Sequence, residues 1–139
     1  MRLFYVDTNI WIDYFENRSD GLRPLGEWAN QFFIQCKQFH AHIVVSDHVL
    51  NELSQFYTPQ QLDLFFESFG KLIVNISTKN NQLVEAKNIE RSFPESHHAD
   101  ILHAIIARDM NALVITRDKG FYSLSKIVRV ARPEEISLD

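Results

Sequence analysis

The amino-acid sequence predicts an α/β fold in which a mainly parallel sheet is covered by helices on both faces. Short apolar runs rich in branched and aromatic residues alternate with longer segments whose apolar residues recur at helical spacing. Parallel strands need long crossover connections, so this alternation places helices between the strands and against the sheet. With 139 residues, 45% of them hydrophobic, and no Pro/Gly/Ser-rich divider, the chain is expected to form one domain over residues 1–139.

The first strand and helix follow one another directly. Arg2–Val6 is a short run of aromatic and branched residues, and Asp7 ends it. Apolar residues at helical spacing begin at Ile10, and Thr8 or Asn9 can cap the exposed amide groups of that helix. Asp7 is therefore expected between a buried strand and a helix N-terminus.

The second strand is expected between two helices. Leu25–Phe39 has apolar residues on or near one helical face, which predicts a helix that packs on the core. The branched run His42–Val45 predicts a strand, after which Ser46 can cap a helix. Glu52 falls on that helix.

The middle of the chain predicts a helix, a strand and a second helix. Thr58 followed by proline is a strong helix start, and Gly70 is the expected stop. Leu72–Ile76 predicts the third strand. Thr78–Ser92 predicts a polar amphipathic helix, which the breaker Phe93–Ser96 ends.

The remaining elements repeat the pattern of the N-terminus. His98–Met110 is an apolar, alanine-rich stretch that predicts a central helix, with Asp100 near its start. Asn111–Thr116 predicts a turn and a buried strand that ends just before Asp118, and Ile127–Val130 predicts the last strand.

Four of the eighteen acidic residues are candidates for a metal centre. Asp7 and Asp118 each follow a strand, and ligands of parallel sheets bind beyond the carboxyl ends of the strands. On the residues alone, Asp100 could equally be a charge that favours its helix dipole, and Glu52 carries a weak signal. Together, four carboxylates are the ligand type that Mg²⁺ or Mn²⁺ prefers, and without metal their repulsion predicts raised carboxylate pKa values.

Four stretches resemble, in order and spacing, the motifs of the PIN-domain family: Phe4–Asn9, Ser46–Leu53, Asp100–Ala104 and Val114–Phe121. The resemblance spans almost the whole chain, whose compact size is similar to that of the VapC-type ribonuclease toxins of toxin–antitoxin pairs. It implies a three-layer α/β/α PIN-like fold with a central sheet of four to five strands.

The resemblance also implies an activity, namely endonucleolytic cleavage of RNA at a Mg²⁺ or Mn²⁺ centre by metal-activated water, leaving a 5′-phosphate and a 3′-hydroxyl. The acidic positions of the family match the catalytic and metal-ligand candidates Asp7, Glu52, Asp100 and Asp118. Small polar residues that could orient these carboxylates are Thr8, Asn9 and Thr116. If the chain is a toxin, an antitoxin that blocks the acidic cleft and a homodimer are expected.

Substrate contacts are harder to identify from the sequence. Arg117 and Lys119 bracket Asp118 and could reach RNA phosphates, or could be ordinary soluble loop residues. Aromatic residues at helical spacing, among them Trp11 and Trp28, are expected in the core or at a dimer interface rather than stacked on bases.

Composition narrows the class of protein. A net charge of −4 argues against a broad electrostatic grip on nucleic acid but not against a nuclease, whose acidic site is negative until it binds cations. The single cysteine, Cys36, excludes an internal disulfide, and neither a signal peptide nor a membrane span is predicted. The protein is expected to be cytoplasmic.

Two alternative functions also fit the sequence. A local cluster of His97, His98, Asp100 and His103 would suit a histidine-rich metal hydrolase that uses zinc, manganese or iron. A PIN-like module without catalytic activity could instead bind RNA or a protein partner.

Overall fold

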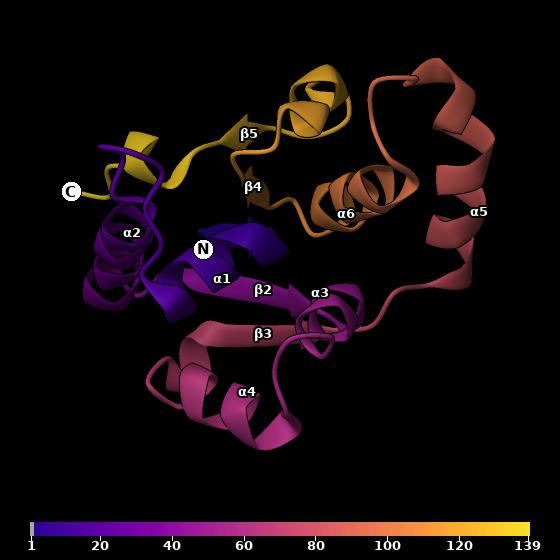
Figure 1. Cartoon of the computed structure of the whole chain (residues 1–139). Helices are drawn as coiled ribbons and strands as arrows, with labels where there is room; N and C mark the ends of the chain where they lie inside the picture. Colours follow the sequence, from indigo (N-terminus) through magenta and orange to yellow (C-terminus); the bar gives the residue numbers. More distant parts are fainter. Residues whose placement is uncertain (1) are drawn as a thin grey trace.

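The computed structural model describes residues 2–139, and within this range five parallel strands form one sheet in the order β3-β2-β1-β4-β5 (Figure 1). The strands are β1 Leu3–Val6, β2 His42–Ser46, β3 Ile73–Ile76, β4 Leu113–Ile115 and β5 Val130–Ala131. All four neighbouring pairs are parallel. The predicted α/β class and parallel sheet are confirmed.

Helices connect the strands and complete a three-layer α/β/α arrangement. They are α1 Thr8–Glu16, α2 Leu25–Phe39, α3 Asp47–Leu53, α4 Pro59–Glu67, α5 Asn80–Ile89 and α6 His98–Asp109. The chain builds the sheet from β1 outward to β3 and then returns to the other side of β1 for β4 and β5. Because crossover connections are right-handed, this reversal puts α1 and α2 on one face and α5 and α6 on the other (Figure 1).

An aromatic cluster holds the first helical layer together. Trp11 of α1 is fully buried and stacks on Phe33 of α2, with ring centroids 4.7 Å apart. The edges of Phe66 and Phe69, at the end of α4 and just after it, meet the same indole at 4.8 and 5.4 Å. Large aromatic side chains contribute much of the apolar area that a core of this size buries. The expectation that Trp11 is a core residue holds.

Two helices, α3 and α4, start at the residues that the sequence predicted. The Ser46 hydroxyl accepts a hydrogen bond from the backbone N–H of Val49 at 3.1 Å, which caps α3. At α4, the side chains of Thr58 and Gln61 each accept from the other residue's backbone N–H, and Pro59 occupies the first helical position. These caps satisfy amides that have no partner inside the helix.

Two predicted elements are shifted in the structure. The last strand is Val130–Ala131 rather than Ile127–Val130, because the amides of Ile127 and Val128 turn back to the carbonyl oxygen of Leu124. The predicted helix Thr78–Ser92 is shorter: α5 covers Asn80–Ile89, and a 3-10 turn follows. Among residues 2–139, the structure has no helix with the length and apolar character that crossing a membrane requires.

Candidate active site

The two strand-end aspartates meet at the same edge of the sheet. Strands β1 and β4 are direct neighbours, with Val6 paired to Ile115, and the backbone N–H of Asp7 donates to the carbonyl of Ile115 at 2.9 Å. Asp118 follows β4 by three residues. The sequence left open whether these strands are adjacent, and in the structure they are.

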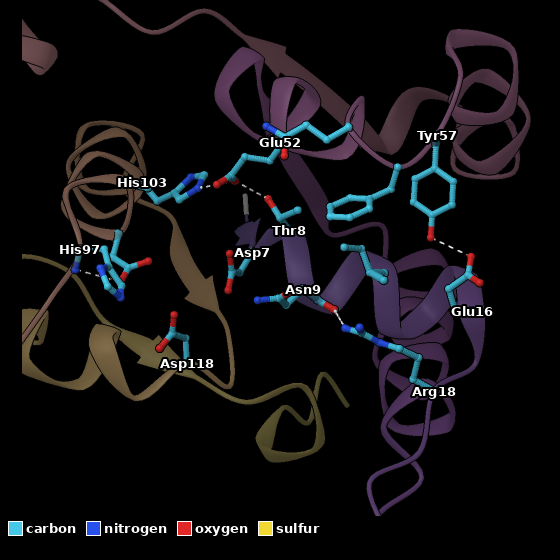
Figure 2. A pocket seen from close by; sticks show the side chains of 15 residues that line it. Asp7, Thr8, Asn9, Glu16, Arg18, Glu52, Tyr57, His97, His103 and Asp118 are labelled. Carbon is cyan, nitrogen blue, oxygen red and sulfur yellow. Dashed lines mark hydrogen bonds and ion pairs between the residues drawn. The ribbon is translucent and has the colours of Figure 1, made fainter.

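A pocket of about 670 Å³ lies beyond these strand ends, and all four candidate carboxylates line it (Figure 2). Asp7 comes from the end of β1, Glu52 from α3, Asp100 from the start of α6 and Asp118 from the segment after β4. The other lining residues include Thr8, Asn9, Ile12, Glu16, Arg18, Gln55, Phe56, Tyr57, His97, Ala99 and His103.

Asp7 is the most deeply placed of the carboxylates, with 6% of its surface exposed. Burial raises its pKa to about 6, although the nearby His103 and a hydrogen bond from Thr116 favour the ionised form. The Thr116 hydroxyl donates to Asp7 Oδ2 at 2.8 Å and accepts from the backbone N–H of Asp118 at 3.0 Å. Thr116 therefore links the two strand-end aspartates.

Glu52 is held by a chain of buried polar groups. Its Oε1 accepts from the Thr8 hydroxyl at 2.6 Å and lies 2.9 Å from Nε2 of His103. The Tyr5 hydroxyl is 2.5 Å from Nδ1 of His103 and 2.7 Å from the hydroxyl of Ser46. Burial acts to raise the pKa of Glu52, but His103 and Thr8 outweigh it and lower that pKa.

The sequence did not identify Tyr5 and His103 as residues that position Glu52 through hydrogen bonds. Tyr5 is fully buried, and burial holds its pKa well above the usual value, so its hydroxyl keeps its proton. The only sequence signal for Tyr5 was its hydroxyl group within the otherwise apolar end of the strand Arg2–Val6. Thr8 was predicted as a helix cap or a carboxylate-orienting residue, and its contact with Glu52 fits the second role, since Asp7 occupies the cap position of α1.

Asp100 and Asp118 converge on the turn around Gly120. Asp118 Oδ1 accepts from the backbone N–H of Gly120 at 2.9 Å. A Cβ atom at Gly120 would lie 2.7 Å from Asp100 Oδ2 and 3.3 Å from Asp118 Oδ1, so only glycine leaves room for both carboxylates. Burial and then the charge of Asp118 raise the pKa of Asp100, whose Oδ2 also accepts weakly from the backbone N–H of His97 at 3.3 Å.

The donor set of this pocket fits a hard divalent cation. Hard cations prefer carboxylate oxygens, and four carboxylates facing one pocket repel one another unless positive charge joins them. The pKa values of Asp7 and Asp100 are raised, which is the direction predicted for a metal-free site, although burial rather than repulsion is the largest cause. The pKa of Glu52 is lowered instead, because His103 and Thr8 stabilise its charge. Asp7, Glu52, Asp100 and Asp118 are thus the candidate ligands for Mg²⁺ or Mn²⁺.

The two basic residues predicted to contact substrate, Arg117 and Lys119, are not among the described residues that line the pocket. Arg117 is only 13% exposed and donates to both carboxylate oxygens of Glu134, at 2.8 and 2.6 Å, while its guanidinium packs over the ring of Trp28. These contacts hold Arg117 within the fold, and its contact with a phosphate stays a prediction. Lys119 is exposed but is absent from the described residues that line the pocket.

Arg18 is the guanidinium that the described pocket does contain, and sequence reasoning did not identify it. Its Nε donates to Asp13 Oδ1 at 2.8 Å, and its Nη2 approaches the carbonyl oxygen of Asn9 at 3.4 Å (Figure 2). Arg18 reaches the pocket from the loop after α1, and no local sequence pattern marked it.

The predicted cluster of four neighbouring residues on α6 does not form a ligand group within residues 2–139. His97 and His98 are exposed, and His98 faces Glu90 at 3.8 Å. His103 points instead toward Glu52, where His48 joins it. His48 and His103 are therefore the histidines whose ring nitrogens could bind one ion. Glu52 could bind the same ion, and the three side chains meet between helices α3 and α6.

Comparisons with known proteins agree on the fold. A family model described as PIN domain matches residues 4–127. VapBC2 from Rickettsia felis, solved with a promoter DNA fragment, is similar with a TM-score of 0.65 and 17% identity, over 94% of this chain and 98% of that one. FitAcB from Neisseria gonorrhoeae gives 0.63 and 15% over 96% and 99%, and FitAB bound to an IR36 DNA fragment gives 0.59 and 16% over 97% and 98%. No curated protein sequence matches significantly.

Proposed function

Since the chain belongs to the PIN-domain family, we propose that it is a Mg²⁺- or Mn²⁺-dependent endoribonuclease and the toxin of a toxin–antitoxin pair. The observation that carries the proposal is the convergence of four carboxylates from β1, α3, α6 and the segment after β4 on one pocket. Pockets beyond the carboxyl ends of parallel strands are where folds of this class bind ligands.

The proposed ligands are Asp7, Glu52, Asp100 and Asp118. When bound, a divalent ion supplies Lewis acidity, which makes water a better nucleophile and stabilises negative charge on phosphate oxygens. The protein itself needs no nucleophilic side chain for such a reaction. Its contribution is to hold four oxygen ligands in a fixed arrangement before substrate arrives.

The hydrogen bonds around the pocket account for that arrangement. Thr116 holds one oxygen of Asp7 and the backbone of Asp118, so the two strand-end carboxylates keep their relative position. Thr8 and His103 both act on Oε1 of Glu52, and Oε2 accepts no hydrogen bond from the described residues. We therefore assign Oε2 of Glu52 as the oxygen that binds the divalent ion held by the four carboxylates.

The partner that we propose follows from the charge of the pocket. An antitoxin that inserts a basic side chain among the four carboxylates would form charge-assisted hydrogen bonds with them and exclude metal and RNA. Two of the structural neighbours, VapBC2 and FitAB, are described as bound to DNA fragments. The proposal for this chain is an antitoxin-bound state, a homodimer and action on cytoplasmic RNA.

The test is cleavage of total RNA by the purified chain, with mapping of the new ends. We expect cleavage with Mg²⁺ or Mn²⁺, none with EDTA, and 5′-phosphate ends. Asp118→Asn should lower the rate by about a hundredfold or more, since loss of a residue that only supports a metal ligand already costs about 10- to 100-fold. The matched control is Asp63→Asn, which removes a charge from the exposed side of α4.

Two results would overturn the proposal. Full activity of a well-folded Asp118→Asn variant would exclude the carboxylate centre. A folded wild-type chain that binds neither Mg²⁺ nor Mn²⁺ in calorimetry and cleaves no RNA would be a binding module without catalytic activity.

A further inference from the structure

Two histidines and a glutamate come together between helices α3 and α6. His48 precedes Glu52 by four residues on α3, so the two side chains share one face of that helix. His103 reaches them from α6, and the rings of His48 and His103 have centroids 4.6 Å apart. One ligand atom from each of the three residues lies within 4.8 Å of the other two.

His48 brings a nitrogen that the fold does not use. Its Nε2 is buried and has no hydrogen-bond partner within the described part of the chain. A buried polar atom without a partner costs the folded state free energy, so such atoms are uncommon in native proteins. A cation bound at this nitrogen would remove that cost.

His103 already has the orientation that a metal ligand needs. Its Nδ1 contacts the Tyr5 hydroxyl at 2.5 Å, which fixes the ring and directs Nε2 toward Glu52 Oε1, 2.9 Å away. Metal-bound histidines almost always donate a hydrogen bond from the second ring N–H. When a cation binds Nε2, the proton between Nε2 and Oε1 would leave, and an Nδ1–H would donate to the Tyr5 oxygen. Tyr5 is held in turn by Ser46, so the ring orientation is set by the buried interior rather than by solvent.

We propose that His48, Glu52 and His103 form a second cation site that selects Zn²⁺ or a similar borderline metal and shares Glu52 with the carboxylate centre. Two imidazoles and one carboxylate are a ligand set that zinc uses with a fourth position left to water. Mg²⁺ takes oxygen ligands and avoids such a site. Tetrahedral ligands bonded at about 2.0–2.1 Å lie about 3.3 Å apart, so the side chains must close by at most about 1.5 Å.

Occupation of this site has a consequence for the proposed nuclease, on which this part of the inference rests. Oε1 of Glu52, which now accepts from Thr8 and His103, would bind the zinc. The carboxylate would then turn toward the histidines and away from the centre that contains Asp7. Zinc binding at the histidine site therefore inhibits cleavage supported by Mg²⁺.

The binding test uses Co²⁺ as a visible substitute for Zn²⁺ on the full chain. We expect the wild type to bind one Co²⁺ with the strong visible absorption of a four-coordinate ion, and Zn²⁺ to displace it. His48→Ala and His48→Gln should each weaken this binding at least tenfold, with thermal melting used to verify that both variants fold. His98→Ala removes an exposed histidine at the start of α6 and should leave binding unchanged.

Asp118→Asn separates the two sites. The histidine site predicts that this variant keeps its Co²⁺ absorption, since Asp118 is not one of its ligands. The inference is overturned if both folded His48 variants bind Co²⁺ as tightly as the wild type. It is equally overturned if Asp118→Asn loses the absorption while the His48 variants keep it, because the ion would then lie at the carboxylates.

Cleavage assays test the inhibition. Added Zn²⁺ should inhibit Mg²⁺-supported cleavage by the wild type. Half-inhibition of His48→Gln, measured against its own zinc-free cleavage rate, should need at least tenfold more Zn²⁺. Equal inhibition of both proteins would refute the regulatory role. If no RNA is cleaved under any condition, the proposed function fails, whereas the Co²⁺ titration still decides whether the histidine site exists.

Discussion

Asp7→Asn tests how much the metal-free protein loses by keeping a carboxylate buried at the end of β1. The folded protein raises the pKa of Asp7 from an ordinary 3.8 to about 6, and burial is the main cause. At about 1.4 kcal/mol per pKa unit, the ionised side chain destabilises the fold by about 3 kcal/mol. Asparagine carries no charge, and its side-chain oxygen can still accept the hydrogen bond from Thr116.

The pH dependence of this effect follows from the direction of the shift. The pKa is higher in the folded state, so the penalty is absent below pH 3.8, develops as Asp7 ionises and is complete above about pH 6. In EDTA, Asp7→Asn should therefore raise the free energy of unfolding by up to about 3 kcal/mol at pH 7.5. At pH 5 the gain should be about half as large.

Urea unfolding followed by circular dichroism measures this gain, with Asp63→Asn as the control for net charge. Saturating Mg²⁺ should reverse the order of stability, because metal bound at the proposed centre would stabilise the wild type, whereas the Asp7→Asn variant lacks one of the proposed ligands. A gain that is the same at both pH values would refute the reasoning, as would a loss of stability in EDTA.

Three further changes probe the support of the pocket and the fold. Gly120→Ala places a methyl group against Asp100 and should weaken Mg²⁺ binding in calorimetry by about tenfold; unaltered affinity would contradict the close approach. Tyr5→Phe leaves Nδ1 of His103 without its partner and should cost about 1–3 kcal/mol in urea unfolding and lower the cleavage rate; a loss under about 0.5 kcal/mol would count against the buried chain. Thr58→Ala removes the α4 cap and should cost about 1 kcal/mol without changing the cleavage rate, so altered cleavage would exclude a purely local role.

The parts of the site that the sequence predicted best are those with local signals. An apolar run that stops at an acidic residue marks a strand end, and this pattern identified Asp7 and Asp118 before any tertiary information was used. The caps at Ser46 and Thr58 were predicted for the same reason, since a cap acts within three residues.

The parts that the sequence did not reveal depend on contacts between distant segments. Arg117 looked free beside Asp118, but its partner Glu134 lies 17 residues further along and is brought close by the fold. His48 and His103 meet although 55 positions separate their numbers. The last strand was predicted at the wrong residues because a strand of two paired residues is too short to give a sequence pattern. The amides just before it form hydrogen bonds within a turn instead of in the sheet.

The order of the sheet also sets when the pocket can exist during synthesis. Strands β1, β2 and β3 are complete once residue 76 has been made, but that half of the chain carries only Asp7 and Glu52. Asp100 is made with α6, and Asp118 follows β4. Strand β4 must pair with β1, the central strand of the finished sheet. Domains form from the N-terminus as the ribosome extends the chain, so a growing chain is unable to assemble all four carboxylates until translation has passed residue 118.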